Sequence, residues 1–282
     1  MVAGIPEGVV RDTVERALAE DVGSGDITTR AVVPAGVSCR AQVVAKEDAV
    51  VAGLFMVEAT FRAVGPAITF QSAVEDGTHV SVGAVVAELA GDVRVVLTGE
   101  RTALNFLQRM SGIATLAARY VEAVKGTKAR ILDTRKTAPG LRLLDKCAVR
   151  MGGACNHRAG LFDGVLIKDN HIRAAGGIGA AVTRARAGCQ HSAKIEVEAQ
   201  SMDQVAQALA AGADVIMLDN MDVEEVRQAV ALIAGRAETE VSGGVTLDTV
   251  RAYAECGVDY ISVGEITHSA PAVDFSLEIV EG

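Results

Sequence analysis

Six apolar, strand-like runs recur in the C-terminal half of this 282-residue chain, and each of them ends in polar residues. The runs are ARILDTRK, DGVLIKDN, AKIEVEAQ, ADVIMLDN, ETEVSGG and VDYISVGE. From the third run onward they recur about every 20–24 residues, with helical stretches at 201–211, 222–235 and 246–256 between them. Near-continuous apolar strands that alternate with helices are typical of a parallel sheet buried on both faces, so we expect an α/β fold.

The first hundred residues predict a smaller, mixed α/β module. Short alternating or β-branched runs, which glycines punctuate and which predict strands, lie at 39–53, 67–77, 79–91 and 93–99. We expect two helices among these strands, near 6–21 and 53–64. From residue 100 the apolar residues recur at threes and fours, which predicts a helix. The dipeptide SG at 111–112 is expected to break that helix into two, with Ser111 as an N-cap.

The number of C-terminal strands limits which α/β architectures are possible. A standard TIM barrel has eight βα units, whereas this pattern contains six, and the N-terminal module does not supply the other two. No GxGxxG follows a first strand, so an open doubly wound sheet fits less well. We therefore expect a six-stranded, TIM-like but incomplete α/β barrel at 106–269. The N-terminal domain is expected at 1–105, and the C-terminal segment 270–282 is a candidate to rejoin it.

Positive charge is concentrated in one segment of an otherwise acidic protein. The formal net charge is −9, yet residues 130–173 carry nine Lys or Arg against four Asp, while the rest carries 18 basic and 32 acidic residues. An acidic protein is a poor general binder of nucleic acid, because phosphate contacts need net attraction. Aromatic residues, which stack on single-stranded bases, make up 3% of the chain. A basic island in an acidic body favours a small, highly anionic ligand.

The sequence also indicates where the protein works. The opening residues lack a basic segment followed by an apolar stretch, and no apolar run reaches the roughly 18–20 residues that a membrane span needs. The five cysteines are scattered without CxxC spacing, so we expect reduced thiols rather than disulfides or a zinc site. We therefore expect a cytoplasmic protein that binds neither a membrane nor nucleic acid.

The ends of the six runs carry the candidate site. Because the carboxyl ends of parallel strands meet at one mouth, we expect their polar residues to converge there. Those at or near the ends are Arg135, Lys136, His157, Arg158, Lys168, Glu198, Asp219, Ser242, Gly243, Gly244 and Gly264. The cations suit carboxylates and phosphates, and glycine-rich turns after the last two strands suit a phosphate. Glu198 and Asp219 can bind ribose hydroxyls or a Mg²⁺ shared with phosphates, and Glu196, one pleat deeper, is expected to support them.

Several segments, in order along the chain, resemble one family. In the C-terminal half they are DTRKTAPGLR, GGACNHRAGLFDGVLIKDNH, IEVE, MLDN, SGG and VGEITHS, and in the N-terminal half EDVGSGDITT and GERTALNFLQRMSGIAT. Together they resemble quinolinate phosphoribosyltransferase, also called carboxylating nicotinate-nucleotide pyrophosphorylase. The resemblance covers essentially the whole chain.

This resemblance implies a glycosyltransferase of the pentosyltransferase class that serves NAD biosynthesis. With Mg²⁺, such an enzyme joins quinolinate to phosphoribosyl pyrophosphate and releases pyrophosphate and CO₂, giving nicotinate mononucleotide. The implied fold is an N-terminal α/β sandwich domain followed by the six-stranded barrel. The implied assembly is a homodimer, in some members built further into a hexamer, in which each active site borrows residues from the partner's N-terminal domain.

The resemblance also implies a role for each matched residue. Arg101 would be the residue lent to the neighbouring subunit. The two carboxylates of quinolinate would be held by Arg135, His157, Arg158 and Lys168. The catalytic residues at phosphoribosyl pyrophosphate would be Lys136, Glu198 and Asp219, of which the two carboxylates would hold Mg²⁺ directly, through water or through the substrate. The 5′-phosphate would lie on Ser242, Gly243, Gly244 and Gly264.

Two positions depart from the family pattern, and other functions stay open. Ala154 stands where relatives often have glycine, Phe162 where they often have a small residue, and His171 is a candidate supporting residue. One alternative is a related phosphoribosyltransferase with another acceptor, such as nicotinate, or the related protein associated with molybdenum uptake. The others are a Schiff-base aldolase with Lys168 as nucleophile and a non-catalytic phosphometabolite-binding protein.

Overall fold

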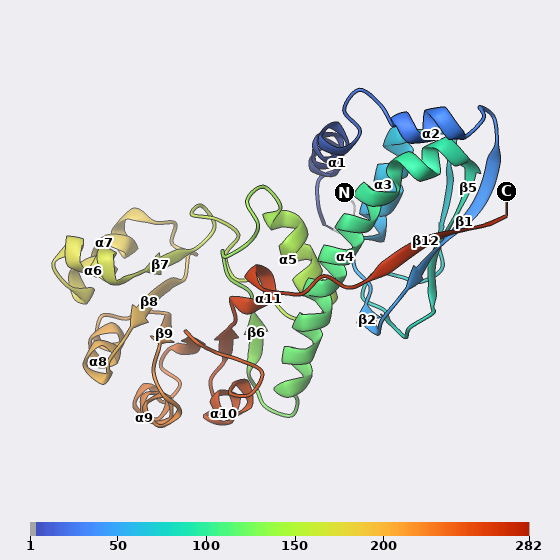
Figure 1. Ribbon diagram of the computed structural model, residues 1–282. Coiled ribbons are helices and arrows are strands. Elements are labelled where there is room, and N and C mark those ends of the chain that lie inside the picture. Colours follow the sequence, from blue (N-terminus) through green and yellow to red (C-terminus); the bar gives the residue numbers. More distant parts are fainter. Residues whose placement is uncertain (1–3, 282) are drawn as a thin grey trace. The chain divides into compact units, whose positions relative to one another are not determined.

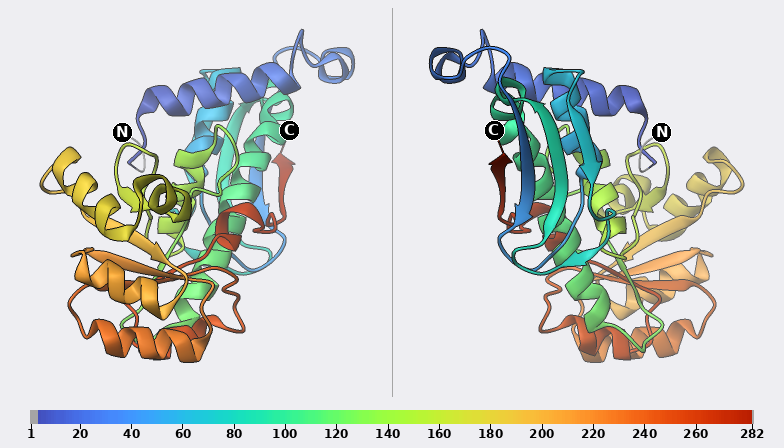
Figure 2. Two further views of the ribbon diagram at one scale, coloured as in Figure 1. Left: turned by 90° about the vertical axis from the view of Figure 1, so that its left-hand side faces the viewer. Right: turned by 90° about the vertical axis from the view of Figure 1, so that its right-hand side faces the viewer.

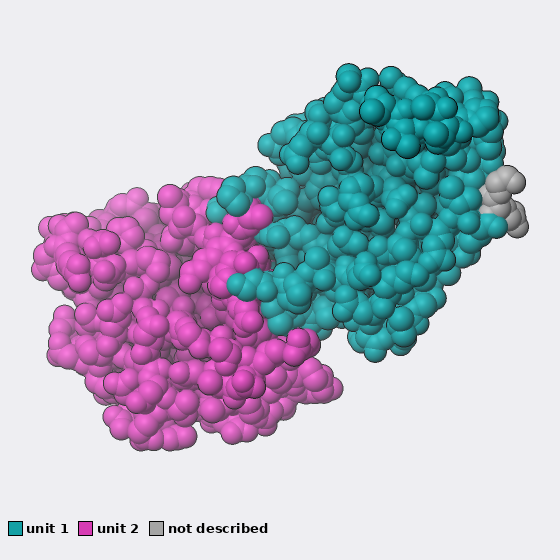
Figure 3. Space-filling view, in the orientation of Figure 1, with its two compact units in different colours: residues 1–118, 139–153, 269–282 teal, residues 119–138, 154–268 magenta. Residues whose placement is uncertain are grey.

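The chain folds into two units, and the computed structural model describes residues 4–281 (Figure 3). Unit 1 contains the chain up to Ala118, then 139–153 and the C-terminal segment from Ser269. Unit 2 contains 119–138 and 154–268. The domain boundary expected near residue 105 stays a prediction.

Unit 1 contains a four-stranded antiparallel sheet. In spatial order its strands are β12 (Phe275–Glu281), β1 (Ser38–Ala45), β5 (Val85–Asp92) and β3 (Thr69–Ser72), shown side by side in the right-hand view of Figure 2. Two short strands, β2 (Ala49–Val50) and β4 (His79–Val80), form a separate pair. Along β1 buried residues alternate with more exposed ones, as expected for a strand with one face on a core.

Unit 1 also contains helices, of which α3 (Leu54–Val64) and α4 (Val93–Ala123) share a buried core with this sheet. The other helices are α1 (Glu7–Asp21), α2 (Ile27–Val32) and α5 (Arg142–Met151), and most of α4 lies in this unit. The helices predicted near 6–21 and 53–64 are confirmed as α1 and α3. Phe61 of α3, Leu104 and Leu107 of α4 and Val43 of β1 share one buried core, which confirms the expected α/β sandwich.

The run at 93–99 is helical, so the strand predicted there was wrong. β5 ends at Asp92, whose Oδ1 accepts a hydrogen bond from the N–H of Arg94 at 2.7 Å, and α4 begins directly afterwards. Val93 and Val96 are buried and lie three residues apart, which is helical spacing. Packing of this apolar stripe therefore outweighs the strand propensity of the valines.

The helix also continues through 111–112, where the sequence predicted a break. Ser111 is buried, and its Oγ accepts a hydrogen bond from the N–H of Ala52 at 2.9 Å, so it binds another segment instead of capping a helix. A Cβ atom on Gly112 would lie 2.0 Å from the carbonyl oxygen of Pro271. Small residues here let other backbone segments pack closely against α4 without ending it.

With 31 residues, α4 is longer than a bilayer requires, but it is amphipathic. Charged residues such as Glu100, Arg101 and Arg109 lie along it. Within residues 4–281, no helix combines the length and the apolar character that crossing a membrane demands.

A parallel sheet forms the centre of unit 2. In spatial order its strands are β6 (Arg130–Leu132), β11 (Tyr260–Ser262), β10 (Glu238–Ser242), β9 (Val215–Asp219), β8 (Ile195–Ala199) and β7 (Val165–Ile167). All six predicted strands are confirmed.

Helices connect these strands and cover one side of the sheet (Figure 1). They are α6 (Asp169–Ala175), α7 (Ile178–Gly188), α8 (Met202–Ala210), α9 (Val223–Ile233) and α10 (Val250–Glu255), and α11 (Glu265–His268) follows the last strand of the sheet. The helices predicted at 201–211 and 222–235 are confirmed. The helix predicted at 246–256 begins later, because Thr246 and Thr249 close a turn in which the N–H of Thr246 donates to Oγ1 of Thr249 at 3.0 Å.

The two faces of this sheet differ in chemistry. Side chains alternate along a strand, so Ile195 and Val197 of β8 lie on the face covered by helices, and Glu196 and Glu198 lie on the other. The register of neighbouring strands extends this second face, which carries Asp219, Glu240, Ser242 and Ser262. The inside of the barrel is therefore unusually polar for a buried parallel sheet.

The barrel is incomplete between its two edge strands. Among the described residues β6 and β7 share no ladder, and the chain that precedes β7 lies along β6 instead. The N–H of Cys155 donates to the carbonyl of Ile131 at 2.8 Å, and the N–H of Asp133 donates to the carbonyl of Cys155 at 3.1 Å. The predicted incomplete barrel is confirmed, and the segment leading to His157 is fixed along the open edge.

Replacing Gly112 by alanine tests the packing of α4. We expect Gly112→Ala to lower the free energy of unfolding by about 3 kcal/mol or more, because the new Cβ collides with backbone that cannot rotate away. Gly179→Ala in α7 is the matched control, since its Cβ would meet open space and alanine favours a helix by about 0.5–1 kcal/mol. Urea unfolding measures both, and equal stability of Gly112→Ala and wild type would contradict the packing.

Candidate active site

The predicted site residues of unit 2 lie at the carboxyl ends of its strands, which we call the mouth. They are Arg135 and Lys136 after β6, His157 and Arg158 before β7, Lys168 after β7, Glu198 in β8, Asp219 in β9, Ser242, Gly243 and Gly244 at the end of β10, and Gly264 after β11. All six strands are parallel, so the residues at and after the strand ends share one end of the barrel. His157 and Arg158 precede β7 and lie at that end because their segment runs along β6 and bonds to Asp133.

Lys168 and Glu198 form an ion pair between neighbouring strands. The Nζ of Lys168 lies 2.5 Å from Oε2 of Glu198. The carboxylate side chain is 7% exposed and the lysine side chain 45% exposed, so the pair lies between the barrel interior and solvent. His171 fixes the start of α6, because its Nδ1 accepts a hydrogen bond from the N–H of Lys168 at 2.9 Å. Lys168 can therefore reach a ligand from a fixed backbone.

Two guanidinium groups approach one another at the open edge. Burial, and then the positive charge of Arg135, lower the pKa of Arg158 from its ordinary value. The Nη1 of Arg158 donates a hydrogen bond to the carbonyl of Gly164 at 3.0 Å, which fixes the direction of its side chain. An anionic ligand beside such a pair would offset the repulsion between like charges.

Asp133 anchors the loop that carries His157 and Arg158. It is fully buried directly after β6, and its Oδ1 accepts a hydrogen bond from the N–H of His157 at 2.8 Å. Its Oδ2 accepts one from Nδ2 of Asn156 at 2.7 Å. The sequence analysis did not select this residue, although its place at a strand end was a usable signal.

Both ring nitrogens of His157 contact the protein. Nδ1 accepts a hydrogen bond from the N–H of Arg158 at 2.8 Å. Nε2 lies 3.1 Å from Oε2 of Glu196 and 3.6 Å from Oε1 of Glu240. The ring is therefore directed into the barrel, and its predicted contact with substrate stays a prediction.

The carboxylate of Asp219 is held by two amide groups. Its Oδ2 accepts hydrogen bonds from Nδ2 of Asn220 at 2.8 Å and from Nε2 of Gln200 at 3.2 Å. Asn220 has φ of 57°, a left-handed conformation that, apart from glycine, Asn adopts more readily than most residues. Gly243 packs directly on it, since a Cβ there would lie 2.3 Å from Oδ1 of Asn220.

Glycine turns follow the last two strands, as predicted. Gly243 and Gly244 have φ of 94° and 62°, and a Cβ on Gly244 would meet open space. The surface of the turn is therefore formed by backbone rather than by side chains. A Cβ on Gly264 would lie 3.1 Å from Cδ of Lys136, and Oγ1 of Thr267 donates to the carbonyl of Lys136 at 2.9 Å. These contacts bring the β6 and β11 ends of the mouth together.

Two further polar residues lie one pleat deeper, and the sequence analysis missed both. Glu240 precedes the end of β10 by two residues and is 2% exposed. Its Oε1 accepts a hydrogen bond from Oγ of Ser262 at 2.5 Å. Burial, and then the negative charge of Glu196, raise the pKa of Glu240 to about 8. Residues two apart in a strand share one face, so Glu240 lies on the same face as Ser242 at the end of β10, just as Glu196 does with Glu198. This spacing was the signal in the sequence that could have identified Glu240.

The remaining predicted residues lie elsewhere. Arg101 is exposed on α4 in unit 1, so its role in a partner's site stays a prediction. Ala154 is buried beside the open edge, whereas Phe162 is 89% exposed at a loop tip. Asp163 shapes that loop by accepting hydrogen bonds from two backbone N–H groups, at 2.7 and 2.9 Å.

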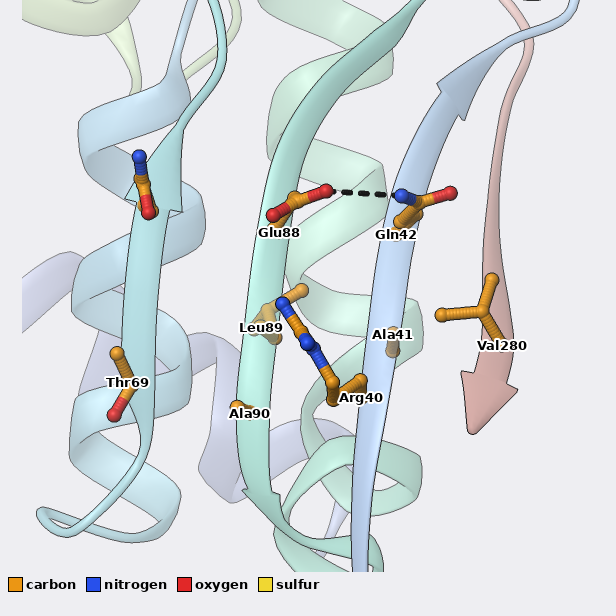
Figure 4. A pocket seen from close by; sticks show the side chains of 9 residues that line it. Arg40, Ala41, Gln42, Thr69, Glu88, Leu89, Ala90 and Val280 are labelled. Atoms are coloured by element: carbon orange, nitrogen blue, oxygen red, sulfur yellow. Dashed lines mark hydrogen bonds between the residues drawn. The ribbon is translucent and has the colours of Figure 1, made fainter. Parts of the chain in front are cut away.

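Two hollows lie away from these residues. One lies on the sheet of unit 1 (Figure 4), where Nε2 of Gln42 donates to Oε1 of Glu88 at 2.9 Å beside Arg40. The other lies at the amino ends of the strands of unit 2, where Lys194 pairs with Glu238 at 2.6 Å. Of the predicted site residues, all of them described, none lines either hollow.

The mouth thus combines cations, two carboxylates and open glycine turns. The cations are Arg135, Lys136, Arg158 and Lys168. Guanidinium and ammonium groups bind carboxylates and phosphates, and carboxylates near them can hold a hydrated divalent cation. The arrangement suits a polyanionic substrate pair and contains the groups needed to stabilise a charged leaving group.

Comparison with known families covers most of the chain. Residues 26–111 match the quinolinate phosphoribosyl transferase N-terminal domain, and residues 113–278 match its C-terminal domain. The probable nicotinate-nucleotide pyrophosphorylase (carboxylating) of Bacillus subtilis is 43% identical over 92% of this chain and 90% of its own length. The chloroplastic nicotinate-nucleotide pyrophosphorylase (carboxylating) of Arabidopsis thaliana is 44% identical over 96% of this chain and 82% of its own.

Solved structures agree with these matches. The nicotinate-nucleotide pyrophosphorylase of Francisella tularensis superposes with a TM-score of 0.95, at 40% identity and over 99% of both chains. NadC of Streptococcus pyogenes gives 0.94, at 43% identity and over 97% of both chains. Human nicotinic acid phosphoribosyltransferase gives 0.63 at 16% identity, over 97% of this chain and 74% of its own, which shows a shared fold alone. The resemblance inferred from the sequence is confirmed: this chain belongs to the quinolinate phosphoribosyltransferase family.

Proposed function

We propose that the protein transfers the phosphoribosyl group of phosphoribosyl pyrophosphate to the nitrogen of quinolinate, with decarboxylation. The products are nicotinate mononucleotide, pyrophosphate and CO₂, so the enzyme would supply NAD biosynthesis. Family membership over both domains supports this reaction. The observation that carries it is the mouth itself, where cations from both edges of the barrel lie at the same end as the glycine turns.

The two carboxylates of quinolinate are assigned to the cations at the open edge. Arg135 and Arg158 are close enough for one charge to lower the pKa of the other, so a dianion is a favourable neighbour for both. Lys168 approaches from the next strand and can exchange Glu198 for a substrate carboxylate. His157 would assist through the loop that it shares with Arg158.

Phosphoribosyl pyrophosphate is assigned to the other side of the mouth. Backbone N–H groups of Ser242, Gly243 and Gly244 would bind the 5′-phosphate, with Gly264 leaving room beside them. Lys136 lies against Gly264, where it can reach a phosphate group. Glu198 and Asp219 face the sugar, where a carboxylate stabilises the positive charge that develops at the anomeric carbon.

Glu198 and Asp219 also fit the role of Mg²⁺ ligands. Mg²⁺ prefers oxygen ligands and in phosphate sites uses one or two carboxylates together with water and substrate oxygens. Among the described residues, the hydrogen bonds to Asp219 use Oδ2 and the ion pair of Glu198 uses Oε2. Each carboxylate thus keeps a second oxygen for a hydrated ion. Bound with the substrate, Mg²⁺ would neutralise the departing pyrophosphate.

The chemistry requires orientation and fixed charge rather than a protein nucleophile. The pyridine nitrogen forms a bond to the anomeric carbon while the bond to pyrophosphate breaks with its electron pair. The bond to the adjacent carboxylate then breaks, its electron pair stays on the ring carbon beside the cationic nitrogen, and a proton replaces CO₂. Preorganised cations at the mouth stabilise the leaving group throughout.

A direct assay tests the proposal. The purified protein is incubated with Mg²⁺, phosphoribosyl pyrophosphate and carboxyl-labelled quinolinate, and labelled CO₂ and pyrophosphate are measured. We expect equal amounts of both products, neither of them without Mg²⁺, and no pyrophosphate when nicotinate replaces quinolinate. Pyrophosphate with nicotinate would instead support the alternative acceptor, and binding without either product would support a sensor.

Lys168→Ala and Lys194→Ala form a matched pair at opposite ends of the barrel. Each lysine pairs with a glutamate on a neighbouring strand, at 2.5 and 2.6 Å. We expect Lys168→Ala to lower kcat/KM for quinolinate about 100-fold or more, because a charge-assisted contact is lost. Lys194→Ala should keep its activity within about twofold. Steady-state kinetics decide this, and equal losses in the two variants would remove Lys168 from the site.

We further propose a cytoplasmic homodimer in which Arg101 completes the partner's mouth. Mixing inactive Arg101→Ala and Lys168→Ala subunits should then restore activity, since half of the dimers are mixed and each mixed dimer regains one intact site. Statistical exchange gives about a quarter of wild-type activity. Size-exclusion chromatography with light scattering verifies the dimer, and exchange of labelled subunits without any recovery would contradict site sharing.

A further inference from the structure

A buried polar cluster lies inside the barrel, one pleat below the mouth, and the proposed reaction uses none of its members except His157. It contains Glu196 of β8, Glu240 of β10 and Ser262 of β11, together with His157 from the open edge. One nitrogen or oxygen atom of each of the three titratable members lies within 4.8 Å of the others. Such a cluster has to balance its charges and hydrogen bonds internally, because little water reaches it.

The hydrogen bonds fix the state of the His157 ring. The backbone N–H of Arg158 is always a donor, so Nδ1 of His157, 2.8 Å away, must be the acceptor and carry no proton. The ring proton is therefore on Nε2, which points at the carboxyl groups of Glu196 and Glu240. A ring in this state is neutral and donates one hydrogen bond.

The two glutamates then have too few donors between them. Oε2 of Glu196 receives the ring N–H at 3.1 Å, and Oε1 of Glu240 receives the hydroxyl of Ser262 at 2.5 Å. Oε1 of Glu196 is buried, and the described residues offer it no hydrogen bond. A carboxyl oxygen of Glu240 lies within 4.8 Å of one of Glu196, so a proton on Glu240 is the nearest candidate for the missing donor.

A metal ion is the other way to neutralise a histidine and two glutamates, but it fits less well. A metal would need the lone pair of Nε2, and the remaining ring nitrogen would then carry a proton and donate it outward. Here Nδ1 faces another donor, the N–H of Arg158, at 2.8 Å. The ring is thus oriented for donation toward the glutamates rather than for metal binding.

We propose that Glu240 is a positioning residue for phosphoribosyl transfer. As a neutral carboxylic acid it donates a hydrogen bond to Glu196, which in turn holds the Nε2–H of His157 and so fixes the loop that carries Arg158. This inference rests on the proposed function, because Arg158 is assigned there to quinolinate. Glu240 itself is two residues below the strand end and acts through its neighbours.

The cluster matters because the His157 ring joins this loop to the interior of the barrel. Asp133 holds the backbone N–H of His157 at 2.8 Å, while the imidazole holds the next N–H, that of Arg158. Losing the ring orientation would therefore release the backbone at Arg158. A guanidinium displaced by about 1 Å is enough to weaken substrate positioning strongly.

The pH dependence follows from the groups that face Glu240. They are Glu196 on β8, His157 at the open edge, Ser262 and Tyr260 on β11, and the uncharged Met217 on β9. Burial and the charge of Glu196 raise the pKa of Glu240 to about 8, against the opposing effect of His157. Glu240 is thus neutral below pH 8, and above it a second negative charge enters the cluster and repels Glu196.

Two substitutions of Glu240 test the positioning role. Glu240→Ala should lower kcat/KM for quinolinate about tenfold or more. Glu240→Gln should rescue most of this loss, because a neutral amide can donate to Glu196 and accept from Ser262. The wild type should lose activity as pH rises through about 8, and Glu240→Gln should lack that loss. Glu238→Gln, at the amino end of the same strand, is the control and should keep the wild-type profile.

Readouts without catalysis separate this inference from the proposed function. Nitrogen NMR of labelled His157 should show the Nε2–H tautomer. The unfolding free energy of wild type relative to Glu240→Gln should fall between about pH 4.5 and pH 8, since only the folded chain keeps the proton there. An Nδ1–H tautomer, a metal ion bound to Nε2 of His157, or a Glu240→Gln pH profile equal to wild type would overturn the proposal. Absence of CO₂ release would overturn the proposed function. The tautomer of His157 and the pH dependence of unfolding would still test the hydrogen bonding of the cluster.

Discussion

Burial of titratable side chains on the inner face of a parallel sheet is the constraint on which unit 2 depends. Such a sheet is normally apolar on both faces, whereas this one carries glutamates at 196, 198 and 240 on its inner face. Each of them has a partner: His157, Lys168 and Ser262, respectively. Removing one partner would leave an uncompensated buried group, which costs several kcal/mol.

The same constraint connects the interior of the barrel to its mouth. The ion pair of Lys168 with Glu198 lies at the rim, and the cluster of His157 with Glu240 lies one pleat below. Lys168 at the rim can exchange its partner for substrate, because its side chain is 45% exposed to solvent. Groups one pleat deeper cannot, so they are suited to hold the loops in place. Depth in the barrel thus separates binding from positioning.

The strands and most helices were predictable because their signals are local. Apolar runs of four or five residues with helices between them specify a parallel sheet, and all six were found. The run at 93–99 misled because its valines favour a strand, although their spacing of three fits a helix packed on the core. Gly112 suggested a helix break that does not exist. A glycine is needed there because the backbone of Pro271, distant in sequence, packs directly against the helix.

By itself, the sequence determined the fold class, the family and the residues at the strand ends, because parallel strands bring their carboxyl ends together whatever the details. Only the tertiary structure decided which of these residues pair, and it added Asp133, Glu240 and Ser262. Strand register and the path of the chain along the open edge set those contacts, and both arise from packing between segments far apart in sequence. The state of the His157 ring was beyond the sequence for the same reason, since it depends on which donors and acceptors surround it in the folded chain.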